Sequence, residues 1–531
     1  MLCFLWLPSL TLYGVALLRA LATQPERIIA SLPISPLSRG LLLNTLFLGA
    51  LTTFIAAILG APVAWIIARG RPRVWSGFAT LLCAVPLALP PALAASAWLE
   101  WTRTPPARGM ASLAAQSSLP VSPIFVAAPL LAFCFFPLVV FPLAAAWRAL
   151  PQEWEEAADL FGPPLQTARR VLWPLLWPAL AGACGLVAAM TCWEMGAPDL
   201  LDARTYAVQI YRNISVPDAW DAGGELKSAL GGLPMLLLGA LTLWPALRAL
   251  KFYGALGSTA PRGSTPRRAP YWVSIVALLV FAVSPIAVLA IFAWQLQGWH
   301  LALKVWGDAQ REIFNTAGLA TAAAISITLS AFWLVASWRS WPAKWRQGVL
   351  CLTVAPLFVA PLLQAVALIH FYNRPMFALV YGGVGPIGWE PFDTFFVFAA
   401  RYGLMLIGYA TRFLPLAILL LHEAIGRVDG SLLEAAASAG ATPLQSARSI
   451  LWPLLKPALL GVFALVWALC ASELSMAVLI NAPGGQTLTV PIFNWMHIAS
   501  TPEVATLSLT LAAMSGGVLG VVLFLLAMRK R

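Results

Sequence analysis

Apolar runs of roughly 20 residues recur from one end of the chain to the other, with short polar segments between them. A bilayer core takes about 20 apolar residues per helix, and the runs lack the alternation of barrel strands. The pattern therefore predicts an all-α polytopic membrane protein with about 12 transmembrane helices. The expected spans lie near residues 4–18, 41–67, 75–98, 121–147, 174–193, 226–247, 272–294, 316–338, 348–370, 395–421, 453–471 and 504–528.

The composition excludes most soluble classes. Of the 531 residues, 60% are hydrophobic and 10% are charged, whereas a soluble domain carries roughly 25% charged residues. A soluble enzyme, a disordered chain and a disulfide scaffold do not fit, and membrane lipid is the expected surrounding. The net charge of +12 comes from basic residues in short loops, without a basic stripe in a polar segment. We therefore expect no nucleic-acid partner.

The basic loops indicate the orientation of the chain. They follow the second, sixth and eighth spans, and the chain ends in Arg529–Arg531. Because positive loops mark the cytoplasmic side, we expect both termini to be cytoplasmic. Ala20–Ala22 offers a cleavage site that would instead make the first span a signal peptide. No Lys or Arg precedes that apolar run, which favours a retained span.

The two halves of the chain repeat each other at a nearly constant offset. Pro91 corresponds to Pro361, and Trp173 corresponds to Trp452. Six spans separate equivalent elements, so the repeats run parallel, in two pseudo-symmetric six-helix halves that enclose a pathway at their interface. The expected domains are a first half at 1–253, a Gly/Pro/Ser-rich cytoplasmic linker at 254–270 and a second half at 271–531.

Two equivalent cytoplasmic segments, 151–174 and 429–453, carry the most specific pattern. We call them the first elbow and the second elbow. In the second, Ser431 and Glu434 have the spacing of a capping box that opens a short helix. Gly440 is placed to end that helix at a positive φ. Thr442, followed by Pro443 and by Gln at the third helical position, begins the next helix.

The elbows resemble the signature loop of permease subunits of binding-protein-dependent ABC importers. That loop reads EAA, three residues, G, nine residues, I-x-L-P. The second elbow fits with Glu434, Gly440, Ile450 and Pro453, but has Trp452 where Leu is usual. The first elbow keeps the EAA and Gly positions, with a shifted register after the glycine. Two copies in one chain resemble the fused two-halves permeases of the iron(III) and thiamine uptake type.

The resemblance implies a type I ABC importer permease in the bacterial inner membrane. It implies two copies of a separate cytoplasmic ATPase, one for each elbow, and a periplasmic solute-binding protein. Each elbow would be a coupling helix that docks on the ATPase. The residues concerned are Glu156, Ala157, Ala158 and Gly162 in the first elbow, and Glu434, Ala435, Ala436 and Gly440 in the second.

Known catalytic patterns are missing from the sequence. A Walker A loop places Gly before its Lys, and none of the six lysines follows a glycine. The four histidines are scattered, and the seven cysteines form no CxxC pair. We therefore expect no enzyme activity, no cofactor and no metal site, and we expect ATP hydrolysis in the partner.

A few polar residues in or beside the spans are candidate pathway residues. Arg412 lies well inside an apolar run, where a charge is costly and often functional. It could face the solute, form a structural ion pair or snorkel to the interface. Glu194 and Glu473 stand at equivalent span ends on the outer side and could line the outer mouth or be ordinary helix-end residues. Asn44 and Asn315 are expected to cap or bond helices rather than touch the solute.

The function predicted is a permease that forms the pathway of an ABC importer for a small solute. A thiamine-like organic cation or iron(III) is the preferred solute. The alternative is a secondary transporter of twelve spans driven by an ion gradient. That class usually carries carboxylates within its spans, whereas the acidic residues here lie almost wholly in loops.

Overall fold

The computed structural model describes residues 35–69, 85–102, 122–150, 170, 172–215, 229–242, 244–245, 248, 286–296, 298–338, 341–372, 399–426, 428–498 and 501–528. Within these ranges the secondary structure is helical, without a strand. Six helices of the described part are long and apolar enough to cross a membrane, or up to eight if each bent pair is one span. The all-α polytopic class is confirmed. The total of about 12 spans includes residues outside the described part and stays a prediction, as does retention of the span at 4–18.

The chain forms two compact units. Unit 2 consists of Leu41–Thr205 and Leu237–Trp294, and unit 1 consists of Met1–Gly40, Tyr206–Leu236 and Gln295–Arg531. A segment of the first sequence half, Tyr206–Leu236, thus belongs to the unit that contains most of the second half. The predicted domain boundaries at 253 and 271, with the linker between them, lie outside the described residues and stay a prediction.

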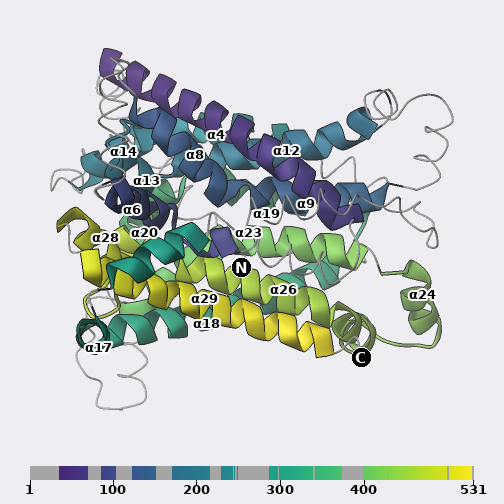
Figure 1. Ribbon diagram of the computed structural model, residues 1–531. Helices are drawn as coiled ribbons and strands as arrows, with labels where there is room; N and C mark the ends of the chain where they lie inside the picture. The colour runs from purple at the N-terminus through teal and green to yellow at the C-terminus, as the bar shows by residue number, and fades with distance from the viewer. Residues whose placement is uncertain are drawn as a thin grey trace. The chain divides into compact units, whose positions relative to one another are not determined.

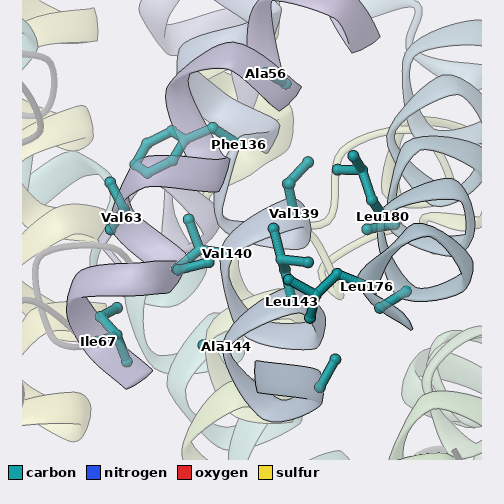
Figure 2. Packing of buried hydrophobic residues seen from close by; sticks show 14 of the residues in the cluster. Ala56, Val63, Ile67, Phe136, Val139, Val140, Leu143, Ala144, Leu176 and Leu180 are labelled. Carbon is teal, nitrogen blue, oxygen red and sulfur yellow. The ribbon is translucent and has the colours of Figure 1, made fainter. Parts of the chain in front are cut away.

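Unit 2 has its core where three helices meet. Ala56, Val63 and Ile67 of the first long helix pack against a helix that follows Phe136 and against the span that begins at Trp173 (Figure 2). Most of these buried side chains are Ala, Val or Leu, so the helices approach closely. The elements are α4 (Pro36–Arg69), η2 (Val85–Ala88), α6 (Pro91–Thr102), α8 (Pro123–Phe135), α9 (Pro137–Ala149), α12 (Trp173–Trp193) and α13 (Gly196–Leu200).

Unit 1 is built around one long helix that packs along two others, α18 against α23 and α26. Figure 1 shows α24 at the opposite end of this unit from α17 and α28. The elements are α14 (Tyr206–Ile214), α17 (Trp299–Asp308), α18 (Gln310–Trp338), α19 (Ala343–Val354), η5 (Ala355–Phe358), α20 (Pro361–Tyr372), η7 (Ala399–Gly403), α23 (Leu404–Gly426), α24 (Gly430–Ser438), α25 (Pro443–Ser446), η8 (Ala447–Leu451), α26 (Trp452–Ala471), α27 (Ala477–Ile480), α28 (Thr489–Ile498) and α29 (Thr501–Met528).

The internal repeat is visible in the local structure of both units. The turn η2 has the same length as η5, and helix α6 has the same length as α20. Each element of the first half begins 270 residues before its counterpart in the second. The spans α12 and α26 both start at a Trp-Pro pair. Equivalent sequence positions therefore adopt equivalent conformations.

Prolines interrupt three of the predicted spans. The prediction of a continuous span at 348–370 is wrong, because α19 gives way to the turn η5 and a separate helix α20. Proline lacks an N–H donor and ends the preceding helix. The buried side chain of Gln364 donates from Nε2 to the carbonyl oxygen of Pro356 at 2.6 Å, which satisfies one group freed by the break.

The equivalent break in unit 2 affects the predicted span at 75–98, of which the structure describes η2 and α6. The predicted span at 121–147 is a bent pair rather than one straight helix. Its two helices, α8 and α9, meet at an angle of 43° just before Pro137.

Candidate functional site

The second elbow begins with a capped short helix. The Asp429 side chain accepts a hydrogen bond from the backbone N–H of Ser431 at 3.1 Å, and α24 starts at Gly430. The expectation that Ser431 would be the cap, in a capping box with Glu434, is wrong. Asp429 lies two residues earlier and its carboxylate is an equally good acceptor. It accepts from the N–H of Ser431, so the helix begins before Ser431.

Gly440 ends this helix as the sequence predicts. Its φ is +81°, in the left-handed region. The N–H of Gly440 donates to the carbonyl oxygen of Ala437, and that of Ala441 donates to Ala436 at 2.9 Å. These two bonds are the pair of the Schellman motif, which needs a residue that tolerates positive φ. The chain therefore reverses sharply after α24.

A reciprocal capping box opens the next helix, also as predicted. The N–H of Thr442 donates to Gln445 Oε1 at 2.8 Å, and the N–H of Gln445 donates to Thr442 Oγ1 at 3.3 Å. Helix α25 continues through the π-helical turn η8 into α26. The ring of Trp452 packs edge-on against Phe332 of α18, with centroids 5.2 Å apart. The base of the elbow is thereby anchored to the central helix of unit 1.

The side chains of α24 are not covered by the chain itself. None of its nine residues is buried. Leu432 is 48% exposed and Leu444, on the following helix, is 63% exposed. Among the predicted coupling residues, Glu434 and Ala435 are exposed and Ala436 is half-buried. The second elbow is thus defined by local hydrogen bonds at each turn and presents its surface outward.

The first elbow is largely outside the described residues. The predicted positions Glu156, Ala157, Ala158 and Gly162 all fall there, so their role stays a prediction. The description resumes where this elbow joins α12, at the exposed Trp173.

Two of the candidate pathway residues form an ion pair. Arg412 Nη1 of α23 lies 2.6 Å from Glu473 Oε1, which follows α26, and their side chains are 19% and 5% exposed. The guanidinium also lies over the ring of Phe413. Of the alternatives for Arg412, the structural ion pair is therefore present. Whether Arg412 and Glu473 also line the solute pathway stays a prediction.

Glu194 and Glu473 make the same local contact in the two halves. Glu194 Oε1 accepts from the N–H groups of Gly196 and Ala197, and Glu473 Oε1 accepts from that of Met476. Each glutamate thus caps a short helix after its span, α13 or α27. A pathway role for Glu194 stays a prediction.

The paired Asn residues tie the spans to the loops that follow these short helices. Asn44 Nδ2 donates to the carbonyl oxygen of Arg204, and Asn315 Nδ2 donates to those of Gly484 and Gln486. Tyr402 adds a bond to Asn315 Oδ1 at 2.8 Å. Both Asn residues thus bond loop carbonyls, whereas the sequence predicted that they cap or bond helices.

No group of three or more His, Cys, Asp or Glu side chains within the described ranges could hold a metal ion. Cys134, Cys184, Cys192 and Cys470 are free thiols, and Cys134, Cys192 and Cys470 are buried among the helices. The four histidines lie on separate helices: His300 on α17, His370 on α20, His422 on α23 and His497 on α28.

Taken together, these features define a polytopic helical membrane protein with an internal repeat and an exposed elbow between two spans. No protein-family model matches the chain, and no solved structure matches it either. The chain is 22% identical to the Fe(3+)-transport system permease protein FbpB 2 of Haemophilus influenzae over 491 residues, which cover 90% of this chain and 88% of that protein. It is 24% identical to the probable ABC transporter permease protein y4fN of Sinorhizobium fredii over 547 residues, covering 96% and 90%.

A shorter relative has a higher identity over the part of the chain that it matches. The chain is 31% identical to the molybdenum transport system permease protein ModB of Azotobacter vinelandii over 206 residues, which cover 90% of that protein and 36% of this chain. The chain belongs to the family of ABC importer permeases. ModB matches about a third of this chain over 90% of its own length, whereas FbpB 2 and y4fN match nearly all of the chain. This difference agrees with two permease halves in one polypeptide.

Proposed function

We propose that a separate ATPase docks on the second elbow and drives solute import through this chain. The observation that carries the proposal is the exposure of α24, a nine-residue helix without a buried side chain. A helix this short is marginal by itself, because it forms few hydrogen bonds for the entropy it loses. Its caps at Asp429 and Gly440 keep it folded and ready for a partner.

Docking on this surface fits its chemistry. Leu432 and Leu444 offer apolar side chains, and the alanines of α24 let a partner approach the backbone closely. The first elbow, at 151–174, would take a second ATPase copy. ATP hydrolysis would occur in those subunits, and the present chain would have no enzyme activity of its own. The named relatives are transport permeases, which favours this function over a transporter driven by an ion gradient.

The orientation follows from the same proposal. Both elbows and both termini would lie on the cytoplasmic side of a bacterial inner membrane, where the basic loops are. The ends of the spans near Glu194 and Glu473 would then face the periplasm and meet a solute-binding protein. Glu194, Glu473 and Arg412 would lie near the pathway.

Iron(III) is the first solute to test, because the relative FbpB 2, which matches along 90% of this chain, is named an Fe(3+)-transport permease. A thiamine-like organic cation is the other candidate. The binding protein encoded with the chain would be purified, and its bound iron measured by elemental analysis and its thiamine by fluorescence. Iron in stoichiometric amount supports the first solute, whereas thiamine supports the second.

Co-purification tests the docking proposal. The tagged chain, solubilised in mild detergent, is expected to bring down a P-loop ATPase in stoichiometric amount. Leu432→Glu places a charge on the docking surface of the second elbow and should lower this recovery at least twofold, since only the first elbow would still bind. Trp345→Glu places the same charge at another exposed hydrophobic residue, on α19, and should leave the recovery intact. Equal recovery of the ATPase with both variants would contradict docking at α24.

A further inference from the structure

The two spans that flank the second elbow are joined again far from it. Helix α23 leads into the elbow and α26 leads out, and the two helices pack against each other. Arg412 stands about 21 Å from the elbow end of α23, at 1.5 Å per residue. There its Nη1 meets Glu473 Oε1 at 2.6 Å. The two spans are thus connected at one end by the elbow and at the other by this ion pair. We call this closed arrangement of α23, the elbow, α26 and the ion pair the frame.

Glu473 extends this frame to the segment beyond α26. Its carboxylate also accepts from the N–H of Met476 at 3.0 Å, where α27 begins. Its carbonyl oxygen accepts from Thr489 Oγ1, at the first residue of α28, at 2.9 Å. The 5% exposure of Glu473 keeps water from competing for these contacts. We call residues 473–498 the distal segment.

The first half lacks the same charge at the equivalent place. Glu194 corresponds to Glu473 and caps α13 in the same manner. Arg412, however, corresponds to Cys134, a buried free thiol. An uncharged thiol cannot form the ion pair that a guanidinium forms with a carboxylate. In both halves the glutamate therefore accepts hydrogen bonds from backbone amides at the following short helix. Only in the second half does the span before the elbow supply an arginine that pairs with this glutamate.

We propose that Arg412 and Glu473 are positioning residues that make the distal segment move with α23 and α26 when the ATPase displaces the second elbow. This inference rests on the proposed function. Packed apolar helices can slide by small amounts, whereas a desolvated ion pair holds its two atoms at one separation. The pair therefore transmits the elbow's displacement across the membrane as a rigid-body movement of the second half.

The proposal differs from two simpler roles for the same residues. A pathway role predicts a change in solute transport without a change in how the distal segment follows the elbow. A role in stability alone predicts faster opening of the distal segment in every state of the ATPase. The distinguishing property is the response of the distal segment to ATP.

Hydrogen exchange measured by mass spectrometry tests this response without knowledge of the solute. The permease with its ATPase would be placed in lipid nanodiscs and measured with and without ATP and vanadate. In the wild type we expect ATP to change exchange in both the elbow, 429–446, and the distal segment, 473–498. In Glu473→Gln the elbow should still respond, and the response of the distal segment should fall by at least half.

Glu194→Gln is the matched control, since it removes the equivalent charge in the half without the arginine. It should leave the response of the distal segment unchanged. If Glu473→Gln does not assemble with the ATPase, the double variant Arg412→Glu with Glu473→Arg is measured instead. A response of the distal segment to ATP within about twofold of wild type supports the proposal, and loss of that response overturns it. A wild-type response retained in Glu473→Gln overturns it as well. A wild-type chain that binds no ATPase would instead overturn the proposed function.

Discussion

Gly440 offers a direct test of how the second elbow is held. Its φ of +81° costs an L-residue roughly 1–2 kcal/mol relative to glycine. A Cβ at this position would meet nothing within 4 Å, so the cost of Gly440→Ala comes from the backbone alone. Because none of the α24 side chains is buried, this cost falls on the shape of the elbow rather than on the packed core.

The affinity for the ATPase should report that cost. If the elbow binds only in its turned conformation, the apparent dissociation constant rises as that conformation becomes less populated. A cost of roughly 1–2 kcal/mol corresponds to a rise of about 5–30-fold. Gly440→Asn should show a smaller rise, because Asn tolerates positive φ better than Ala does. Thermal denaturation of the detergent-solubilised chain should stay unchanged in both variants.

The assay is titration of the purified ATPase against immobilised permease. Gly430→Ala is the control, since Gly430 begins α24, has no positive φ, and an added Cβ would meet only Glu434 Oε1, at 4.0 Å. It should change affinity by less than about twofold, within the range of ordinary surface substitutions. Equal effects of the substitutions at Gly430 and Gly440 would refute the role of the left-handed turn.

Three further changes test other contacts. Thr442→Ala removes one side of the capping box that Thr442 forms with Gln445 and should cost about 1 kcal/mol locally, seen as faster hydrogen exchange of the next three amides. Asn315→Leu leaves two loop carbonyls without their donor and should lower the melting temperature more than Asn44→Leu, which frees one; equal losses would contradict this. Gly185→Ala would push a Cβ into a backbone carbonyl of a neighbouring helix and should reduce folded yield sharply, whereas Gly461→Ala has open space and should be neutral in the same yield assay.

The sequence predicted best what depends on neighbouring residues. The turn at Gly440 and the capping box at Thr442 follow from local rules, since each uses backbone groups within a few positions. The cap at the start of α24 was predicted two residues late, because Asp429 and Ser431 both suit that role. The choice between them depends on backbone dihedrals that sequence does not display.

Hydropathy located the apolar runs but not their interruptions. The run 348–370 is predominantly apolar along its length, although Pro356 and Pro361 divide it. Gln364 was missed entirely as a structural residue. A polar side chain eight residues after a proline within an apolar run was the available signal, since it can satisfy the carbonyl that the break leaves free.

The ion pair shows the limit of the sequence more clearly. Arg412 and Glu473 were each identified, one as a charge inside a span and the other as a repeated glutamate. Nothing in their spacing of 61 residues shows that they meet. The contact arises from the packing of α23 against α26, which is a tertiary property.

The central claim is that the exposed second elbow is the docking site of an ATPase. The most direct measurement is photo-crosslinking in intact membranes from a photoreactive residue at Leu432. The matched position is Phe314, which is 73% exposed near the opposite end of unit 1. We expect a crosslink from position 432 to a P-loop ATPase, identified by mass spectrometry, and none from position 314. A crosslink to lipid alone at position 432, with the ATPase present in the same membranes, would contradict the claim.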